Sequence, residues 1–518
     1  MLSNKAEEEE ESSHAEHVRV KHPSFPVTRS TYGYALGAAL NSCNLGYDIG
    51  ISTNAGPLIA TDFELTPVQL ELFLGSLNFW TIFGALGSPY LTDRYGRTTT
   101  FVIAAMGFLV GIGVMILSSS FESLMMGRMI VGVAVGVGEA VDPMYIAEIS
   151  PKHVRGRLVS WAEAGVALGV VLGFSSSLVF YAVESVAIKW RCMLGAGIIL
   201  PIIMVLMVAL GFLPESPQWL ISQNQESAAR VVLERIYPSD TIDDVVDDIQ
   251  SSIELERQSS NAVGWNAIFV PSPAVKRMLM VGIGMATIQQ AVGIDAVMFY
   301  LMFVIKGSGI ATELGEVAAL IVLGLVKLVF VFVGANLFDR VGRRPLLFVS
   351  LCGMAAALVI VSITFLFQSH VSEAGTVLGL ALYLAFFSIG VGPGNWVVVS
   401  EIFATSIRAK GMCVAVLPNR IMATLMASSF LSLAKWLTWP GFFFVLALIC
   451  LASALFLWSY LPETKGKSLE EMSCYFAALT GDRSILDTED RWHHRHSPCD
   501  ESSMELPGWH EANRPVMT

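Results

Sequence analysis

The sequence DRYGRTT, residues 93–99, returns almost unchanged as DRVGRRP at residues 339–345. Two further motifs return in the same order: AEISPKHVRG recurs as SEIFATSIRA, and PESPQWL recurs as PETKGKSL. In all three cases the second copy follows the first by about 250 residues, which is the signature of a large internal repeat. The repeats therefore predict two homologous halves in parallel orientation.

The composition places both halves in a membrane. The chain has 518 residues, of which 54% are apolar and only 15% charged, and its mean hydropathy is +0.60. These values exceed what the core of a soluble protein requires. The net charge of -12 comes mostly from the two ends and from a polar stretch between the halves. No basic patch suggests a nucleic acid partner.

The apolar segments number about twelve if a helix needs roughly 20 residues to cross a bilayer. Basic residues concentrate in alternate connections, such as DRYGR, KHVRGR and DRVGRR, whereas TDFELT and SSSFES are acidic or neutral. By the positive-inside rule the basic connections face the cytosol, and an even number of spans puts both termini there too. The polar first 30 residues contain no cleavable signal, so we expect the first span to direct insertion.

We therefore expect an all-α membrane protein with twelve transmembrane helices in two six-helix bundles. The expected organisation is a cytosolic tail (1–30), an N-terminal bundle (31–213), a cytosolic linker with helices (214–274), a C-terminal bundle (275–461) and a second cytosolic tail (462–518).

The repeated motifs, together with QQAVGIDAV and GPGNWVVVSEIF, resemble those of the sugar porter family of the major facilitator superfamily. The resemblance runs from about Gly33 to Met472, and GIDAV, GLVK and NRIMA most resemble plant-type polyol and monosaccharide proton symporters. It implies a secondary active transporter that carries a polyol or monosaccharide together with protons by alternating access. It also implies a monomer in the lipid bilayer of the plasma membrane. The sequence shows no nucleotide loop, metal-ligand spacing or nucleophile constellation, so we expect neither an enzymatic activity nor a cofactor.

Lys327 is the most conspicuous polar residue, because it interrupts the apolar run GLVKLVFVFV. It lies twelve residues before Asp339, which is roughly 18 Å along a helix and close to the middle of the membrane. An ionisable side chain at that depth normally faces a cavity or a partner. The preceding span contains Asp295 just after Gly293, where a local break would open the helix towards a cleft. We expect an Asp295–Lys327 pair that binds hydroxyl groups, the alternative being a pair that only joins two helices.

The family resemblance adds further candidate ligands for the substrate. This chain has Glu163 at a position where relatives commonly have glutamine. It has Asp295 and Lys327 at positions where they have asparagine, and Arg420 where they have tryptophan. These departures match a polyol-type cavity lined by charged groups. The other matching positions are Gln289, Gln290 and Asn419, with Trp396 as a stacking or gating aromatic and Phe299 and Tyr300 as an outer gate.

Energy coupling is predicted at Asp48, in LGYDIGI. In the family an aspartate at this place accompanies proton symport, and Arg128, in GRMIVG, matches its partner. Their depths in the membrane allow the two side chains to meet. We expect protonation of Asp48 to weaken the pair and allow the loaded carrier to reorient; the alternative is a static salt bridge between helices.

The repeated charged motifs are expected to form salt-bridge networks at the cytosolic face, which latch the outward-open state in the family. We call these residues the latch set: Asp93, Arg94, Arg97, Glu148, Arg155, Glu215, Asp339, Arg340, Arg343, Glu401, Arg408 and Glu463.

Three features allow more than one interpretation. Glu139 and Asp142 could form a second titratable pair, but we expect them to face water near the cytosolic mouth.

The histidine-rich segment 491–499 resembles a metal ligand set, yet such tails are usually solvated, so we assign no metal site. A facilitative uniporter and a non-transporting sugar sensor remain as alternative functions; Asp48 argues against the first and the short C-terminal tail against the second.

Overall fold

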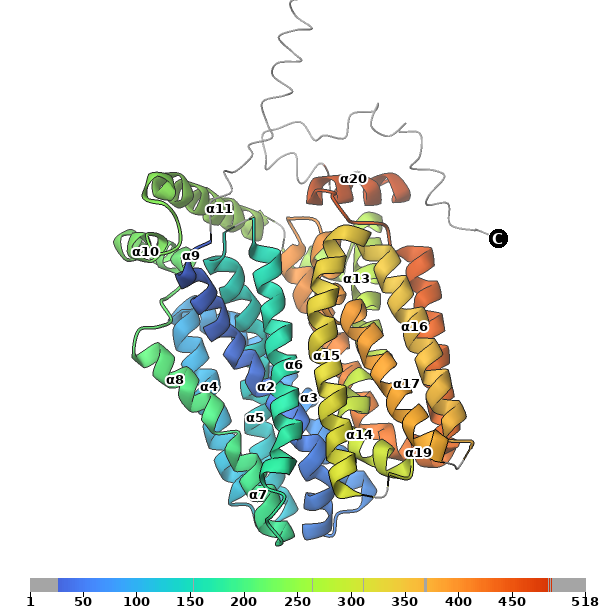
Figure 1. Cartoon of the computed structure of the whole chain (residues 1–518). Helices are drawn as coiled ribbons and strands as arrows, with labels where there is room; N and C mark the ends of the chain where they lie inside the picture. The colour runs from blue at the N-terminus through green and yellow to red at the C-terminus, as the bar shows by residue number, and fades with distance from the viewer. Residues whose placement is uncertain are drawn as a thin grey trace, which may run out of the picture.

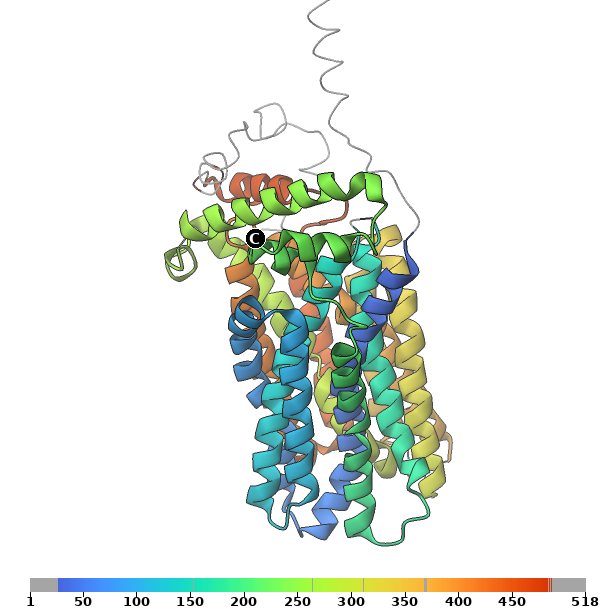
Figure 2. The same cartoon turned by 90° about the vertical axis from the view of Figure 1, so that its left-hand side faces the viewer.

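The computed structural model describes residues 27–482 except Lys152, Val263, Ala311, Gln368 and Ser369, together with Ser484 and Leu486. Figure 1 shows two bundles of long helices side by side, with short helices gathered at one end. We call that end the linker face and the other end the opposite face. The view in Figure 2, turned by 90°, places the short helices at the same end.

The N-terminal half consists of five long helices and one passage formed by two shorter helices. Their bounds are α2 Arg29–Asp62, α3 Pro67–Tyr95, α4 Arg97–Ile116, α5 Phe121–Ile149, α6 Arg155–Val179, α7 Val186–Ala196 and α8 Ile199–Ala209.

Short helices at the linker face separate this half from the next one. They are α9 Pro217–Ser222, α10 Glu226–Leu233, η2 Ser239–Thr241, α11 Ile242–Ala262 and α12 Asn266–Phe269. The C-terminal half contains α13 Pro273–Ala291, α14 Ile294–Gly307, α15 Glu313–Val341, α16 Arg343–Thr364, α17 His370–Ile389, α18 Val391–Ile402 and α19 Arg408–Tyr460. The chain then returns to the linker face with α20 Leu469–Thr480.

Ten helical stretches in the described part of the chain are long and apolar enough to cross a membrane. One of them, α19, has 53 residues and reverses at Thr438, whose φ of 63° interrupts the helix, so it crosses twice. The remaining passage is α2, which is 34 residues long but less apolar because its buried residues include Asn41, Asn44 and Asp48. The predicted all-α fold with twelve passages is confirmed.

Local sequence signals explain where the helices begin and break. Thr66 and Ser120 close capping boxes at the starts of α3 and α5, which satisfies backbone N–H groups that would otherwise lack partners. Gly293 has a φ of 88° and separates α13 from α14, so the break predicted before Asp295 is present.

The repeated DRxGR motif forms the same turn twice. Gly96 (φ 88°) joins α3 to α4, and Gly342 (φ 105°) joins α15 to α16. A Cβ atom at Gly96 would lie 2.4 Å from Glu215 Oε2, and one at Gly342 would lie 3.1 Å from Glu463 Oε2. Glycine is thus required both by the backbone conformation and by the carboxylate packed against the turn.

The two halves meet along three pairs of helices: α2 with α14, α3 with α19, and α6 with α15. The adjacent α6 and α15 are visible at the centre of Figure 1. Polar side chains of these helices and of α5 therefore lie at or near the boundary between the halves.

Candidate functional site

An ion pair connects the two halves in the middle of the membrane. Arg420 of α19 donates to the carboxylate of Glu139 of α5, and the two side chains are 9% and 30% exposed. Glu139 lies ten residues before the end of α5 and Arg420 lies twelve residues after the start of α19, so each is about 15 Å or more from the linker face. Glu139 thus forms an ion pair between the halves, while 30% of its side chain stays exposed.

Asp295 lies beside this pair, in the first turn of α14. The charges of Arg420 and Lys327 act on its carboxylate, and the amides of Asn78 and Gln290 lie next to it. Asp295 and Glu163 in turn act on the charge of Glu139. The charged residues of this central cluster are Glu139, Glu163, Asp295, Lys327 and Arg420, contributed by helices of both halves.

The predicted direct pair between Asp295 and Lys327 is absent. The two charges interact, but within the described residues Lys327 makes neither an ion pair nor a hydrogen bond, although its side chain is only 5% exposed. Arg420 also acts on Asp295 but forms its ion pair with Glu139. Lys327 thus brings a buried ammonium with three unused donors to the central cluster.

Amide side chains next to the cluster join helices within the C-terminal half. Gln289 donates to the carbonyl of Gly392 (3.0 Å) and accepts from Asn395 (3.1 Å) and Asn419 (2.9 Å). Asn419 also donates to the carbonyl of Ala286 (2.7 Å). Gln289 and Asn419 therefore connect α13, α18 and α19 in this structure. Sequence reasoning missed Asn395, although GPGNWVVV contains it.

The other predicted ligands and gate residues differ in their environment. Trp396 is half-buried on α18, and buried Gln290 has an amide oxygen without a partner, as do Asn395 and Asn419. Phe299 is fully buried. Tyr300 donates to the carbonyl of Ala427 and stacks on Phe430 at 4.6 Å, so it is part of the packing of the C-terminal half.

A second ion pair lies inside the N-terminal half. Arg128 Nη1 of α5 donates to both carboxylate oxygens of Asp48 at 2.9 and 2.8 Å, and Nη2 donates to Ser52 Oγ at 2.6 Å. The ring of Phe73 lies 4.4 Å from the guanidinium carbon. Both charged side chains are buried. The sequence thus identified two residues, 80 positions apart, that do meet.

Asp142 also lies in the interior and not in water. It is 1% exposed and accepts hydrogen bonds from Asn41 (2.8 Å) and Ser42 (2.5 Å) of α2. No cation among the described residues pairs with it. The expectation that Asp142 faces water is wrong, because α2 and α5 pack closely at this level.

The latch set forms two matching networks at the linker face. Arg97 binds Glu148 with two hydrogen bonds (2.8 and 2.7 Å), and Arg343 binds Glu401 (3.1 Å). Glu215 accepts from the backbone N–H groups of Arg97 and Thr98 at the start of α4, and Glu463 does the same for Arg343 and Arg344 at the start of α16. These ion pairs stay within one half.

The remaining latch residues make no ion pair within the part of the chain that the structure describes. The carbonyls of Asp93 and Arg340 accept from Trp219 and Lys465, and Arg94 donates to Tyr90. Arg155 is half-buried and Arg408 exposed. The Asp339 side chain lies outside the described residues, as does the histidine-rich segment 491–499. Arg97–Glu148 and Arg343–Glu401 are thus the latch ion pairs seen among the described residues.

Side-chain contacts between the halves gather towards the opposite face. Glu71 of α3 accepts from the backbone N–H and the hydroxyl of Ser432 of α19, both at 2.6 Å. Thr53 donates to the carbonyl of Met298 (2.8 Å), and Lys189 binds Glu313 (2.7 Å). Together with Glu139–Arg420 they join the halves from mid-membrane to the opposite face.

Comparisons with known proteins agree with this architecture. The family model described as sugar (and other) transporter matches residues 34–476. Probable polyol transporter 4 of Arabidopsis thaliana is 39% identical over 445 residues, which is 85% of this chain and 84% of that protein. Polyol transporter 5 of the same plant is 34% identical over 481 residues, 88% of each chain.

A solved structure of the major facilitator superfamily proton:xylose symporter XylE, bound to 6-bromo-6-deoxy-D-glucose, has a TM-score of 0.73 and 25% identity. The match covers 86% of this chain and 99% of that chain. A structure described as an inward open conformation of the xylose transporter XylE from E. coli matches with the same TM-score, identity and coverage.

Proposed function

This chain belongs to the sugar transporter family of the major facilitator superfamily and is an integral membrane transporter of sugars or polyols; on that premise we propose that it is a proton-coupled symporter. The observation that carries the coupling is the buried Asp48–Arg128 pair, held by Ser52 and Phe73. Polyols are the favoured substrates, because several relatives are described as polyol transporters.

The central cluster is the proposed substrate site. Carboxylates accept hydrogen bonds from hydroxyl groups, and ammonium and guanidinium groups donate to them, so a chain of hydroxyls meets a partner at every position. Glu139, Glu163 and Asp295 would accept, and Lys327 and Arg420 would donate. Gln290, Asn419 and Trp396 complete the site from the C-terminal half, while Gln289 holds Asn395 and Asn419 in place.

Binding and reorientation are linked through Arg420. A substrate that bonds to Arg420 competes with Glu139, and loss of that pair removes a connection between the halves. Because an ion pair spanning two moving bodies favours the state in which it forms, its exchange for substrate contacts shifts the conformational equilibrium.

Proton coupling involves the Asp48–Arg128 pair. Protonation of Asp48 removes the negative charge that Arg128 binds, so α2 and α5 lose a strong contact inside the N-terminal half. The contacts between the halves at the opposite face then break as the halves rock. The linker face is in the cytosol with both chain ends, the host membrane is the plasma membrane, and the protein works as a monomer.

Substrate-evoked current in voltage-clamped oocytes at external pH 5.5 and 7.5 tests the proposal. Sorbitol, mannitol, myo-inositol, glucose and xylose are applied in turn. Symport predicts inward current that grows with acidity for at least one of them. Radiolabelled uptake without current at either pH would contradict proton symport and indicate a uniporter.

A further inference from the structure

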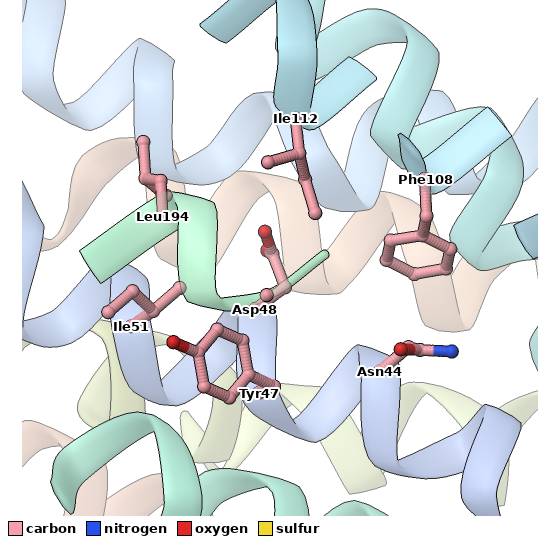
Figure 3. A pocket seen from close by; sticks show the side chains of 8 residues that line it. Asn44, Tyr47, Asp48, Ile51, Phe108, Ile112 and Leu194 are labelled. Carbon is pink, nitrogen blue, oxygen red and sulfur yellow. The ribbon is translucent and has the colours of Figure 1, made fainter. Parts of the chain in front are cut away.

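A small cavity lies beside Asp48, and Arg128 is not among the residues that line it. It is lined by Asn44, Tyr47 and Asp48 of α2, by Ile112 of α4 and by Leu194 and Gly197 near the end of α7. Figure 3 shows the side chains of Asn44, Asp48 and Tyr47 around this space, with Phe108 and Ile112 closing it. Its volume of about 10 Å³ is close to that of a single water molecule.

Asn44 brings an unused acceptor to the cavity. It is 3% exposed, its Nδ2 donates to Asn41 Oδ1 at 3.4 Å, and its buried Oδ1 has no hydrogen-bond partner in the structure. Asn44 precedes Asp48 by four residues, which places both side chains on one face of α2, one turn apart. A buried acceptor without a partner is unfavourable, so this site attracts a donor.

Arg128 cannot provide an acceptor for the O–H group of a protonated Asp48. A guanidinium has donors and no acceptor, so it binds the carboxylate but cannot accept from a protonated carboxyl group. The Tyr47 hydroxyl donates to the carbonyl of Met193 (2.8 Å). Within the described part of the chain, Arg128 and Tyr47 are the titratable groups beside Asp48. Helix α3 contributes Phe73 to these surroundings, and α4 contributes Phe108 and Ile112.

We propose that the cavity binds one water molecule, which bridges Asp48 and Asn44 Oδ1 and makes Asn44 a positioning residue for proton coupling. The inference rests on the proposed symport at Asp48. The water donates to Asn44 in both states. It donates its second hydrogen to the ionised carboxylate and accepts from the carboxyl O–H once Asp48 is protonated, so Asp48 has a partner in each state.

Loss of the bridge affects the two states of Asp48 unequally. The ionised form keeps both hydrogen bonds from Arg128, whereas the protonated form loses its acceptor. Transport should then need a higher proton concentration. We expect the external pH that gives half-maximal substrate current to fall by half a unit to about one unit, the effect of roughly one hydrogen bond.

The experiment compares Asn44→Val with Asn44→Thr by current recording in oocytes between pH 4.5 and 8. The two side chains have the same shape, but only threonine restores an acceptor. Asn44→Val should shift the midpoint to lower pH, and Asn44→Thr should recover most of the shift. Asn54→Val is the control, because Asn54 is an equally buried amide of α2 that bonds to carbonyls of α6 and lies outside the cavity lining.

A second variant changes the cavity at Gly197, which also lines it. A Cβ at Gly197 would lie 2.9 Å from Tyr47 Cε1, so Gly197→Ala would reduce the cavity without changing Asn44. It should shift the midpoint in the same direction, which keeps the proposal testable if the Asn44 variants fail to reach the membrane.

The outcomes separate this inference from the proposed function. A pH-dependent wild-type current with an unchanged midpoint in Asn44→Val and Gly197→Ala would overturn the water site and leave symport intact. Equal shifts in Asn44→Val and Asn44→Thr would also overturn it, since packing would then matter and not the acceptor. Absence of pH-dependent current in the wild type would overturn both.

Discussion

Two buried ion pairs dominate the interior at the scale of single residues. Asp48–Arg128 lies within one half, so it can break and re-form while that half keeps its overall shape. Glu139–Arg420 joins the halves and cannot survive their separation. Breaking either pair leaves a buried charge, which is strongly unfavourable unless a proton, a substrate or water compensates. We propose that the first pair responds to protons and the second pair to the substrate.

Asp48→Asn should abolish accumulation of substrate against its gradient while exchange of labelled for unlabelled substrate continues. The amide cannot gain or lose a proton, but it keeps the shape of the side chain. Uptake and counterflow in proteoliposomes with an imposed pH gradient measure the two activities. Asp62→Asn is the control, because Asp62 lies at the end of the same helix and pairs with Arg191. Accumulation by Asp48→Asn would refute its coupling role.

Lys327→Met should raise the KM for the transported polyol about tenfold or more, because a hydrogen bond from a charged donor contributes about 1.5–3 kcal/mol. The amount of folded protein should be unchanged or higher, since an unpaired buried ammonium is removed. Lys306→Met is the matched control, because Lys306 is half exposed and pairs with Glu316 near the opposite face. An unchanged KM would exclude Lys327 from the site.

At the scale of elements, the repeated glycine turns make the most direct connection between sequence and structure. Each turn combines a positive φ with a carboxylate that caps the next helix, and the carboxylate comes from the segment that follows the last passage of the same half. Negative charge at a helix N-terminus is favourable, so the cap stabilises α4 and α16 as well as the turn.

Gly96→Ala should reduce thermal stability more than Gly342→Ala. A Cβ at Gly96 approaches Glu215 to 2.4 Å, compared with 3.1 Å between Gly342 and Glu463. Both substitutions also place alanine in a backbone region that is essentially reserved for glycine, which alone costs about 1–3 kcal/mol. Gly113→Ala in α4, where a Cβ meets nothing within 4 Å, should be neutral or stabilising. The melting temperatures of the detergent-purified variants give the order of their thermal stabilities. Equal decreases in melting temperature for Gly96→Ala and Gly113→Ala would contradict the prediction.

At the scale of the whole molecule, the contacts between the halves are unevenly distributed. Glu71–Ser432, Thr53–Met298 and Lys189–Glu313 join the halves towards the opposite face, whereas the described ion pairs of the latch set lie within single halves. The structure thus represents a state held together on the opposite face. Reorientation requires these contacts to break.

Glu71→Ala should favour opening on the opposite face, because Ser432 loses the acceptor for both its N–H and its hydroxyl. The rate at which an impermeant thiol reagent modifies a cysteine introduced at Ser428 reports this opening, since Ser428 packs against Gly75 of α3. The rate should rise severalfold. Glu122→Gln, an exposed acid of α5 at the same face, should leave it unchanged, and an equal rate in both variants would contradict the assignment.

The sequence predicted the fold well because repeats and hydropathy are properties of the chain alone. It also paired Asp48 with Arg128, because both residues lie in regular helices of one half whose packing the motifs define. It did not indicate the pair between Glu139 and Arg420, because that pair depends on how the two halves meet. Glu139 and Arg420 are 281 residues apart, and neither hydropathy nor spacing indicates which carboxylate pairs with the Arg420 guanidinium.

The two capping glutamates also bear on how the protein is made. Glu215 lies 118 residues after Arg97, beyond the sixth passage of its half, and Glu463 lies 120 residues after Arg343. During synthesis, the start of α4 leaves the ribosome well before Glu215, so this helix is capped only after the remaining helices of its bundle have been made. Each bundle is therefore completed by its own last-synthesised segment, and a truncated nascent half lacks the group that closes it.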